Sequence, residues 1–125
     1  MTHLDTHVVV WLYEGDASKF PKAVRKRLDA GPLAVSPLVE LELQYLFEIG
    51  RITVAGPDIV GHLRDRIGLT VLDTPFPTVV RHATPLGWTR DPFDRLIVAT
   101  SAAEDAPLLT RDEVIRKHHA LARWG

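Results

Sequence analysis

The segment PLAVSPLVELELQYLFEIG, residues 32 to 50, decides the fold of this chain. PLAV has the apolar composition of a short strand, and Ser36 follows it as the N-cap of a helix that begins at Pro37. That helix is predicted to end at Gly50. A short strand that leads directly into a helix is the repeating unit of a parallel sheet with helices on its faces.

The rest of the chain continues this alternation. Further short strands are predicted at the opening of HLDTHVVVWL (residues 3–12), in LTVLD (69–73) and in PLLT (107–110). Helices are predicted over residues 18–30, 56–68, 75–86 and 92–105, with a last helix or turn over 111–119. We therefore expect an α/β protein with three layers, in which a short central parallel sheet is flanked by helices. Its length of 125 residues predicts a single domain over residues 1–125.

Composition restricts the chemistry that is available to the chain. Cysteine is absent, which excludes disulfides, thiolate metal ligands and cysteine nucleophiles. The net charge is -1, so no overall basic field points to a nucleic acid, although a metal ion could supply positive charge locally. The apolar run in MTHLDTHVVVWL is short and has no basic flank, so we expect a cytoplasmic protein without a membrane span.

Acidic residues fall where such a sheet would place a ligand site, outside the carboxyl ends of its strands. Asp5 closes the first predicted strand, and Asp112 follows the strand at 107–110. Asp94 lies in the first turn of the helix that begins at Pro92. Asp73 also ends a strand, so this position alone does not identify a functional acid.

One glutamate of the helix after Ser36 stands out on a helical projection. Leu38 and Leu46 lie about 40° on either side of Glu42, within the apolar stripe, whereas Glu40 falls on the polar face. A buried carboxylate requires a partner, which could be an arginine such as Arg95, a hydrogen-bond network or a metal ion.

Helix capping offers a second explanation for several of these acids. Asp91 would be the N-cap of the helix that begins at Pro92, and Asp94 would face the positive end of the helix dipole. Asp5 and Asp112 also stand at turns from strand to helix, where acids are frequent caps. If the carboxylates of Asp5, Glu42, Asp94 and Asp112 instead converge, their repulsion calls for a cation, and such oxygen ligands suit Mg²⁺ or Mn²⁺.

These segments carry a resemblance to a known family over nearly the whole chain. The segments LDTHVVVWL, SPLVELELQYLFEIGRI, WTRDPFDRLIVATSAA and PLLTRDEVIRKH, in this order and spacing, resemble the PIN-domain ribonucleases of the VapC toxin type. The resemblance implies a PIN-like fold and a Mg²⁺- or Mn²⁺-dependent endoribonuclease that hydrolyses RNA phosphodiester bonds with metal-activated water. It also implies a toxin of a type II toxin–antitoxin system, a homodimer, and a cognate antitoxin that holds the enzyme inactive.

Carried over by motif, the resemblance implies both the metal-binding acids and their supporting residues. The metal-binding and catalytic acids would be Asp5, Glu42, Asp94 and Asp112. Supporting roles would fall to Asp91, Thr6 and Thr110. Glu40 replaces Glu42 if the helix register is displaced. Candidate contacts to RNA phosphates are Arg90, Arg95 and Arg111, with Lys22, Arg25, Lys26 and Lys117 as further basic positions.

Two other functions compete with a nuclease. The acids could be only caps and ion-pair partners in a non-catalytic PIN-like module for binding and dimerisation. Alternatively, Asp5 could be the nucleophile of a phosphotransfer enzyme, but His7 stands where that chemistry wants a second aspartate. The histidines offer little support for a metal site of their own. His7 near Asp5 could touch substrate, although solvent exposure or a backbone hydrogen bond is the simpler expectation.

Overall fold

Five short strands form one parallel sheet in the computed structural model, which describes residues 1–125. The strands are β1 (Thr2–Leu4), β2 (Leu33–Val35), β3 (Thr70–Val71), β4 (Leu108–Leu109) and β5 (Ala122–Arg123). Their order across the sheet is β3-β2-β1-β4-β5, and all four neighbouring pairs are parallel. The predicted α/β architecture, a short parallel sheet flanked by helices, is therefore confirmed.

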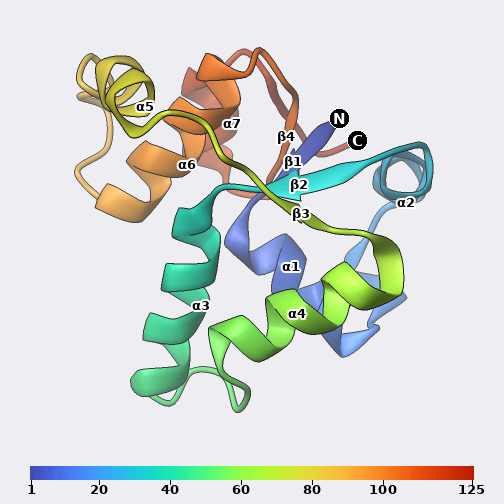
Figure 1. Ribbon diagram of the computed structural model, residues 1–125. Helices are drawn as coiled ribbons and strands as arrows, with labels where there is room; N and C mark the ends of the chain where they lie inside the picture. Colours follow the sequence, from blue (N-terminus) through green and yellow to red (C-terminus); the bar gives the residue numbers. More distant parts are fainter.

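Seven α-helices surround this sheet. They are α1 (Thr6–Glu14), α2 (Lys22–Asp29), α3 (Pro37–Glu48), α4 (Gly56–Ile67), α5 (Phe76–Ala83), α6 (Pro92–Ala103) and α7 (Glu113–His118), with a 3-10 turn, η1, over Ala17–Lys19. Figure 1 shows α1, α3 and α4 grouped below the strands, while α5, α6 and α7 lie above and to the left. None of these helices combines the length and the apolar character needed to cross a membrane.

Two elements differ from the sequence prediction. The sequence predicted a short strand at the opening of HLDTHVVVWL and no helix after it. In the structure, residues 6–14 form helix α1. Valine favours strands because its branched side chain suits a pleated surface, but Val8 and Val9 are completely buried here and packing overrides that preference. Asp5 caps the start of the helix, and Gly15 ends it with a positive φ of 72°. Strand β5 was not predicted.

The order of the strands places a crevice beside β1. The chain adds β2 and β3 on one side of β1, and β4 and β5 on the other, so the direction of winding reverses between β1 and β4. Ligands of open parallel sheets bind outside the carboxyl ends of the strands at such a reversal. In this pair Leu4 is the neighbour of Leu109, and the Asp5 amide donates to the Leu109 carbonyl at 3.0 Å. Asp5 and Thr110 are thereby brought together at the crevice.

The core holds the helices that border this crevice. A single cluster of 18 buried hydrophobic residues joins the sheet to the helices. It includes Leu4 of β1 and Leu109 of β4, together with Val39 and Leu43 of α3 and Ile97 of α6. The first two turns of α3, which carry Glu42, and the first turn of α6, which carries Asp94, are therefore fixed relative to the strand ends.

Candidate active site

Four of the predicted acids line one cavity at the carboxyl edge of the sheet. This acidic cavity has a volume of about 450 Å³. Its lining residues are Asp5, Thr6, His7, Val10, Trp11, Glu42, Leu46, Arg51, Ile52, Asp94 and Asp112. The acids come from the end of β1, from α3, from α6 and from the start of α7, so residues separated by more than a hundred positions are gathered.

Asp5 is the most firmly held of the four acids. The residue is only 4% exposed, and both carboxylate oxygens accept hydrogen bonds. The Thr6 amide donates to Oδ1 at 2.8 Å, and the Thr110 hydroxyl donates to Oδ2 at 2.7 Å. His7 Nδ1 lies 3.6 Å from Oδ2. Asp5 thus caps α1 and faces the cavity at the same time, so capping and a role in the site do not exclude each other.

Glu42 projects into the cavity from α3, whereas Glu40 does not line it. The Thr6 hydroxyl donates to Glu42 Oε1. Burial raises the pKa of Glu42, the hydrogen bond from Thr6 opposes that rise, and the charges on Asp5 and Asp91 add to it. The carboxylate therefore stands in a negative environment that its one hydroxyl partner does not neutralise.

The apolar stripe of α3 is divided in the structure. Val39 and Leu43 are completely buried, but Tyr45 and Ile49 are 47% and 50% exposed. Glu42 lies at the boundary between the buried and the exposed part of the stripe, and not in the centre of a buried face. This boundary position places its side chain on the wall of the cavity.

The carboxyl of Asp94 is electrostatically strained. Burial, followed by the charges on Asp5, Asp91, Glu42 and Asp112, raises the pKa of its carboxyl to about 7. The one ion pair of a lysine or arginine joins Arg64 to Asp65, so no such side chain neutralises Asp94. In particular, the ion pair considered between Arg95 and Glu42 is not formed. His7 approaches Asp5, but burial lowers the pKa of His7 and its Nε2 accepts the Arg111 amide, so the imidazole is neutral.

Asp91 and Asp112 are both helix caps. Asp91 Oδ1 accepts from the amides of Phe93 at 2.8 Å and Asp94 at 3.2 Å, which confirms the predicted cap of α6. Asp112 Oδ1 accepts from the amides of Val114 and Ile115, each at 2.9 Å. Asp91 is exposed and outside the cavity lining, whereas Asp112 both caps α7 and lines the cavity.

The arginines expected to contact phosphate have different environments. Arg95 donates from Nε to the Ala83 carbonyl and from Nη2 to the Thr84 carbonyl, both at 2.9 Å, so its guanidinium caps the end of α5. Arg90 is exposed and does not line the acidic cavity. Arg111 lies directly beside the acidic cavity, in an adjoining cleft that it lines together with His7, Trp11 and Asp112. Only Arg111 of these three is therefore near the acids.

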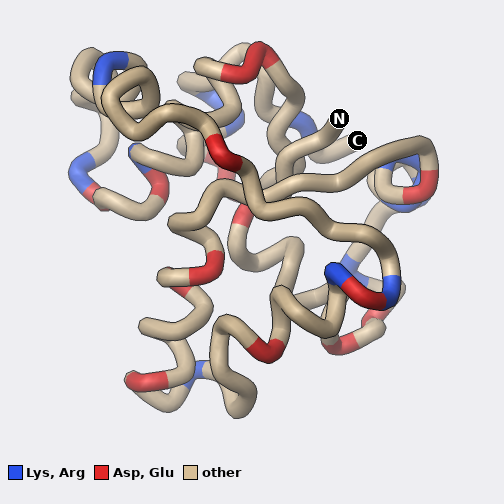
Figure 2. Tube along the Cα trace, in the orientation of Figure 1, with Lys and Arg blue, Asp and Glu red and all other residues tan.

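Lysine and arginine residues are distributed over separate segments of the chain (Figure 2). Lys22, Arg25, Lys26 and Lys117 are exposed and absent from the lining of the acidic cavity. Two titratable lining residues, His7 and Arg51, were not among the predicted site residues. Arg51 follows α3 in a loop, and no sequence motif marks it. His7 accepts the Arg111 amide on Nε2 at 2.9 Å, which is the backbone hydrogen bond that its position suggested.

The chemistry of the cavity fits a hydrated divalent cation. Its acidic donors are all carboxylates, which suit Mg²⁺ or Mn²⁺, and no basic side chain is paired with Glu42 or Asp94. No three Asp, Glu or His side chains are arranged so that they could hold one ion directly. Mg²⁺ usually keeps several of its waters, and the volume of the cavity leaves room for them.

Comparison with known proteins gives one family. The PIN domain family model matches residues 3–121. The chain is 32% identical over 122 residues to Ribonuclease VapC22 of Mycobacterium tuberculosis, a match that covers 92% of this chain and 89% of that relative.

Two solved structures share the fold. The crystal structure of VapBC2 from Rickettsia felis, bound to a DNA fragment from their promoter, matches with a TM-score of 0.71 at 19% identity, covering 98% of this chain and 96% of that chain. A toxin–antitoxin complex from Klebsiella pneumoniae matches with a TM-score of 0.62 at 16% identity, covering 92% and 90%. The chain therefore belongs to the PIN-domain family and is of the VapC type.

Proposed function

We propose that this chain is a divalent-metal-dependent endoribonuclease and the toxin of a type II toxin–antitoxin pair. The observation that supports this most strongly is the gathering of Asp5, Glu42, Asp94 and Asp112 around one cavity without a basic partner for Glu42 or Asp94. Such an arrangement costs stability unless a cation joins it. The ribonuclease name of the relative from Mycobacterium tuberculosis is consistent with that reading.

The carboxylates would divide the work of the reaction. Asp5, Glu42 and Asp94 would hold one ion, directly or through water, and Asp112 would complete the set or position a second ion. A bound Mg²⁺ or Mn²⁺ would supply Lewis acidity at the scissile phosphate and would make water more acidic. One of the carboxylates would accept the proton of the attacking water.

The surrounding hydroxyl groups would keep these carboxylates in place. Thr110 is completely buried, and its hydroxyl both donates to Asp5 and accepts the Asp112 amide at 3.1 Å. Thr6 donates its amide to Asp5 and its hydroxyl to Glu42. Each threonine therefore couples two of the four acids, as expected for supporting residues whose hydrogen bonds orient metal ligands.

Three partners follow from this proposal. The substrate is RNA, and the protein that restrains the enzyme is a cognate antitoxin, in line with the toxin–antitoxin complexes among the similar structures. The chain itself would form a homodimer. Its support is the exposed apolar stripe of α3, where Leu41, Tyr45 and Ile49 are 56%, 47% and 50% exposed at four-residue intervals.

The competing function is a non-catalytic PIN-like module for binding and dimerisation. It is favoured by the caps that Asp5 and Asp112 form, since these give two of the four cavity acids a structural role, as Asp91 has at the start of α6. Metal titration separates the two functions. A module of this kind would bind no Mn²⁺ in calorimetry, and its thermal midpoint would not respond to the ion.

The experiment that tests the nuclease is cleavage of single-stranded RNA with and without Mg²⁺ or Mn²⁺. The wild type, Asp5→Asn and Asp94→Asn are compared, with exposed Asp65→Asn as a matched control on α4. We expect metal-dependent internal cleavage by the wild type and the control, and a loss of about 100-fold or more in the two cavity variants. Unchanged cleavage by Asp5→Asn or Asp94→Asn would overturn the proposal.

A further inference from the structure

Trp11 borders three separate cavities on α1. It lines the acidic cavity and an apolar pocket of about 230 Å³, and it also lines a cleft of about 290 Å³. The cleft, here called the Trp11 cleft, is formed by His7, Trp11, Arg111 and Asp112. Three of these residues also line the acidic cavity, so a ligand could occupy both spaces without leaving the surface.

Aromatic neighbours hold the indole of Trp11 in position. The rings of His7, Trp124 and Phe20 have their centroids 4.9, 6.0 and 6.2 Å from that of Trp11. Their interplanar angles lie between 58° and 64°, so no neighbouring side chain is stacked parallel on the indole. A fixed aromatic ring without a parallel partner can stack against a planar ligand.

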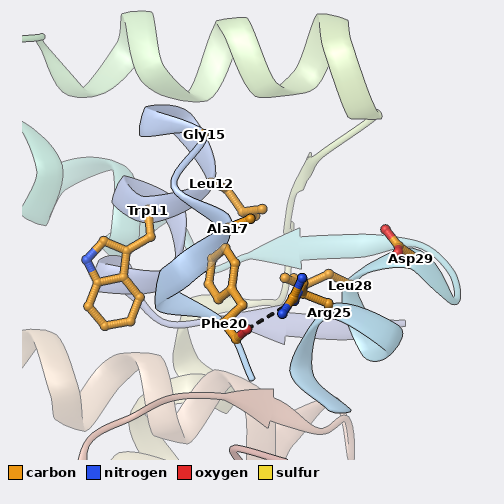
Figure 3. Close-up of a pocket in the computed structure, with 8 residues that line it drawn as sticks. All are labelled: Trp11, Leu12, Gly15, Ala17, Phe20, Arg25, Leu28 and Asp29. Atoms are coloured by element: carbon orange, nitrogen blue, oxygen red, sulfur yellow. Dashed lines mark hydrogen bonds between the residues drawn. The ribbon is translucent and has the colours of Figure 1, made fainter. Parts of the chain in front are cut away.

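The apolar pocket beside Trp11 has few groups that could bind a phosphate (Figure 3). Its walls include Trp11, Leu12, Phe20 and Leu28, with Arg25 as its one basic residue. The Nε of Arg25 already donates to the Phe20 carbonyl at 3.1 Å, as the dashed line in Figure 3 marks. The Trp11 cleft is therefore the better place for a charged, planar ligand.

Two cations lie over the indole ring of Trp11. Arg111 has its Cζ 5.9 Å from the ring centroid of Trp11, and Lys19 has its Nζ at 5.6 Å. The backbone of Arg111 is fixed because its amide donates to His7 Nε2 at 2.9 Å. An aromatic platform flanked by basic side chains suits single-stranded nucleic acid, since bases stack on the ring while phosphates meet the cations.

We propose that the Trp11 cleft binds a nucleotide next to the scissile phosphodiester, with its base stacked on the indole of Trp11 and a phosphate at Arg111. This inference rests on the proposed ribonuclease function and adds a subsite to it. Stacking tolerates every base, because each has a π-face. The cleft therefore requires that a base be present at this one position of the RNA, but it discriminates little among the four bases.

The first arm of the test changes the RNA and leaves the protein intact. A single-stranded RNA that the wild type cleaves is prepared with one abasic ribose at successive positions around the cleaved bond, and kcat/KM is measured for each. We expect a loss of about 10-fold, within a range of about 5- to 150-fold, at one position adjacent to that bond. Exchange among the four bases at that position should change kcat/KM by less than about 3-fold.

The second arm changes the protein. Trp11→Leu keeps an apolar side chain but removes the π-face, and Trp11→Phe restores a smaller one. Trp88→Phe is the control, because Trp88 stacks on His118 at 5.0 Å and lines none of the three cavities. We expect Trp11→Leu to raise KM more than it lowers kcat and to respond little to the abasic ribose. Trp11→Phe should fall between Trp11→Leu and the wild type.

The outcomes separate the subsite from the ribonuclease proposal. If the wild type cleaves RNA but tolerates an abasic ribose at every position, the subsite is overturned and the ribonuclease proposal stands. Full activity of folded Trp11→Leu together with lost antitoxin binding would also overturn the subsite, because it would assign the cleft to a protein partner. If the wild type cleaves no RNA, both proposals fall. Circular dichroism and thermal unfolding confirm that each variant is folded, and the abasic series needs no variant.

Discussion

The hydroxyl of Thr110 donates a hydrogen bond of 2.7 Å to Oδ2 of Asp5, across a separation of 105 residues in the chain. This bond joins the residues that follow β4 and β1, the two strands between which the winding of the sheet reverses. It is buried, so it is stronger than an exposed hydrogen bond and costly to leave unmade. The fold thus fixes the orientation of one acid before any ligand arrives.

Replacement of Thr110 by valine should test this link. The variant keeps the shape of the side chain but leaves Asp5 Oδ2 and the Asp112 amide without their hydroxyl partner. We expect a loss of about 1–3 kcal/mol in the free energy of unfolding, measured in urea, and a clear loss of RNA cleavage. Thr110→Ser retains the hydroxyl and should keep most of the cleavage activity. Equal activity of the valine and serine variants would show that the hydroxyl does not orient the site.

The raised pKa of Asp94 predicts a dependence of stability on pH. The folded protein holds this proton up to a pH of about 7, whereas the unfolded chain releases it near the ordinary value of 3.8. The proton stabilises the folded state fully below pH 3.8, and this contribution is lost as the pH rises from there towards 7. Asp94→Asn should therefore gain stability over the wild type across this range.

Thermal unfolding in EDTA between pH 4 and pH 8 measures that difference. We expect the advantage of Asp94→Asn to grow to about 1–2 kcal/mol by pH 7, a figure reduced for the partial solvent exposure of the group. Asp65→Asn, which changes an exposed acid on α4, should show no such trend. A difference between Asp94→Asn and the wild type that stays constant over the whole pH range would contradict the assigned pKa.

Gly56 allows α3 and α4 to approach each other closely. A Cβ at this position would lie 2.5 Å from the Glu40 carbonyl oxygen and 2.8 Å from the Gln44 amide nitrogen, both backbone atoms of α3. We expect Gly56→Ala to cost about 2 kcal/mol or more in the free energy of unfolding. Because α3 carries Glu42, the cleavage activity of this variant should also fall.

Gly61, on the same helix, provides the matched control. Its nearest neighbour would be the flexible Arg64 side chain at 3.5 Å, so alanine fits there. Gly61→Ala should stabilise the protein by about 0.5–1 kcal/mol, because glycine is a poor residue in a helix interior. Similar stabilities of the two alanine variants in urea denaturation would refute the close approach of the helices.

The exposed stripe of α3 predicts a self-association surface. Tyr45 is 47% exposed and its ring lies 5.9 Å from that of Phe93, so apolar surface extends from α3 to the start of α6. Tyr45→Arg should shift the protein from dimer to the 14.0 kDa monomer in sedimentation velocity. Val114→Arg, at another exposed apolar position on α7, should leave the dimer intact. A wild type that sediments as a monomer at all concentrations would exclude the proposed dimer.

Much of the fold follows from local sequence signals. Ser36 accepts the Leu38 amide as the N-cap of α3, and Asp91 caps α6 ahead of Pro92, both as predicted. Such caps are legible because one residue type satisfies one free amide. Helix α1 was missed because its valines favour a strand locally, and only burial against the core makes them helical.

The remaining features depend on contacts between distant residues. Strand β5 has two half-buried residues, and its place in the sheet is fixed by pairing with β4 rather than by any pattern of its own. Arg95 could not be distinguished from a phosphate-binding arginine, since its partners are carbonyls that the end of α5 supplies. The helical projection aimed Glu42 correctly, but the division of its helix into a buried and an exposed half depends on how α3 meets the core.

The proposed nuclease function depends on the binding of a divalent cation in the acidic cavity. A crystal soaked in Mn²⁺, with anomalous scattering measured at the manganese edge, tests this most directly. We expect an anomalous peak in the cavity, with Asp5, Glu42 and Asp94 coordinating the ion directly or through its waters. Crystals of Asp94→Asn should lose or weaken that peak. Two results would contradict the binding of a divalent cation in the cavity. One is a fully soaked crystal with no anomalous peak there, and the other is a structure in which these carboxylates lie too far apart to share one ion and its waters.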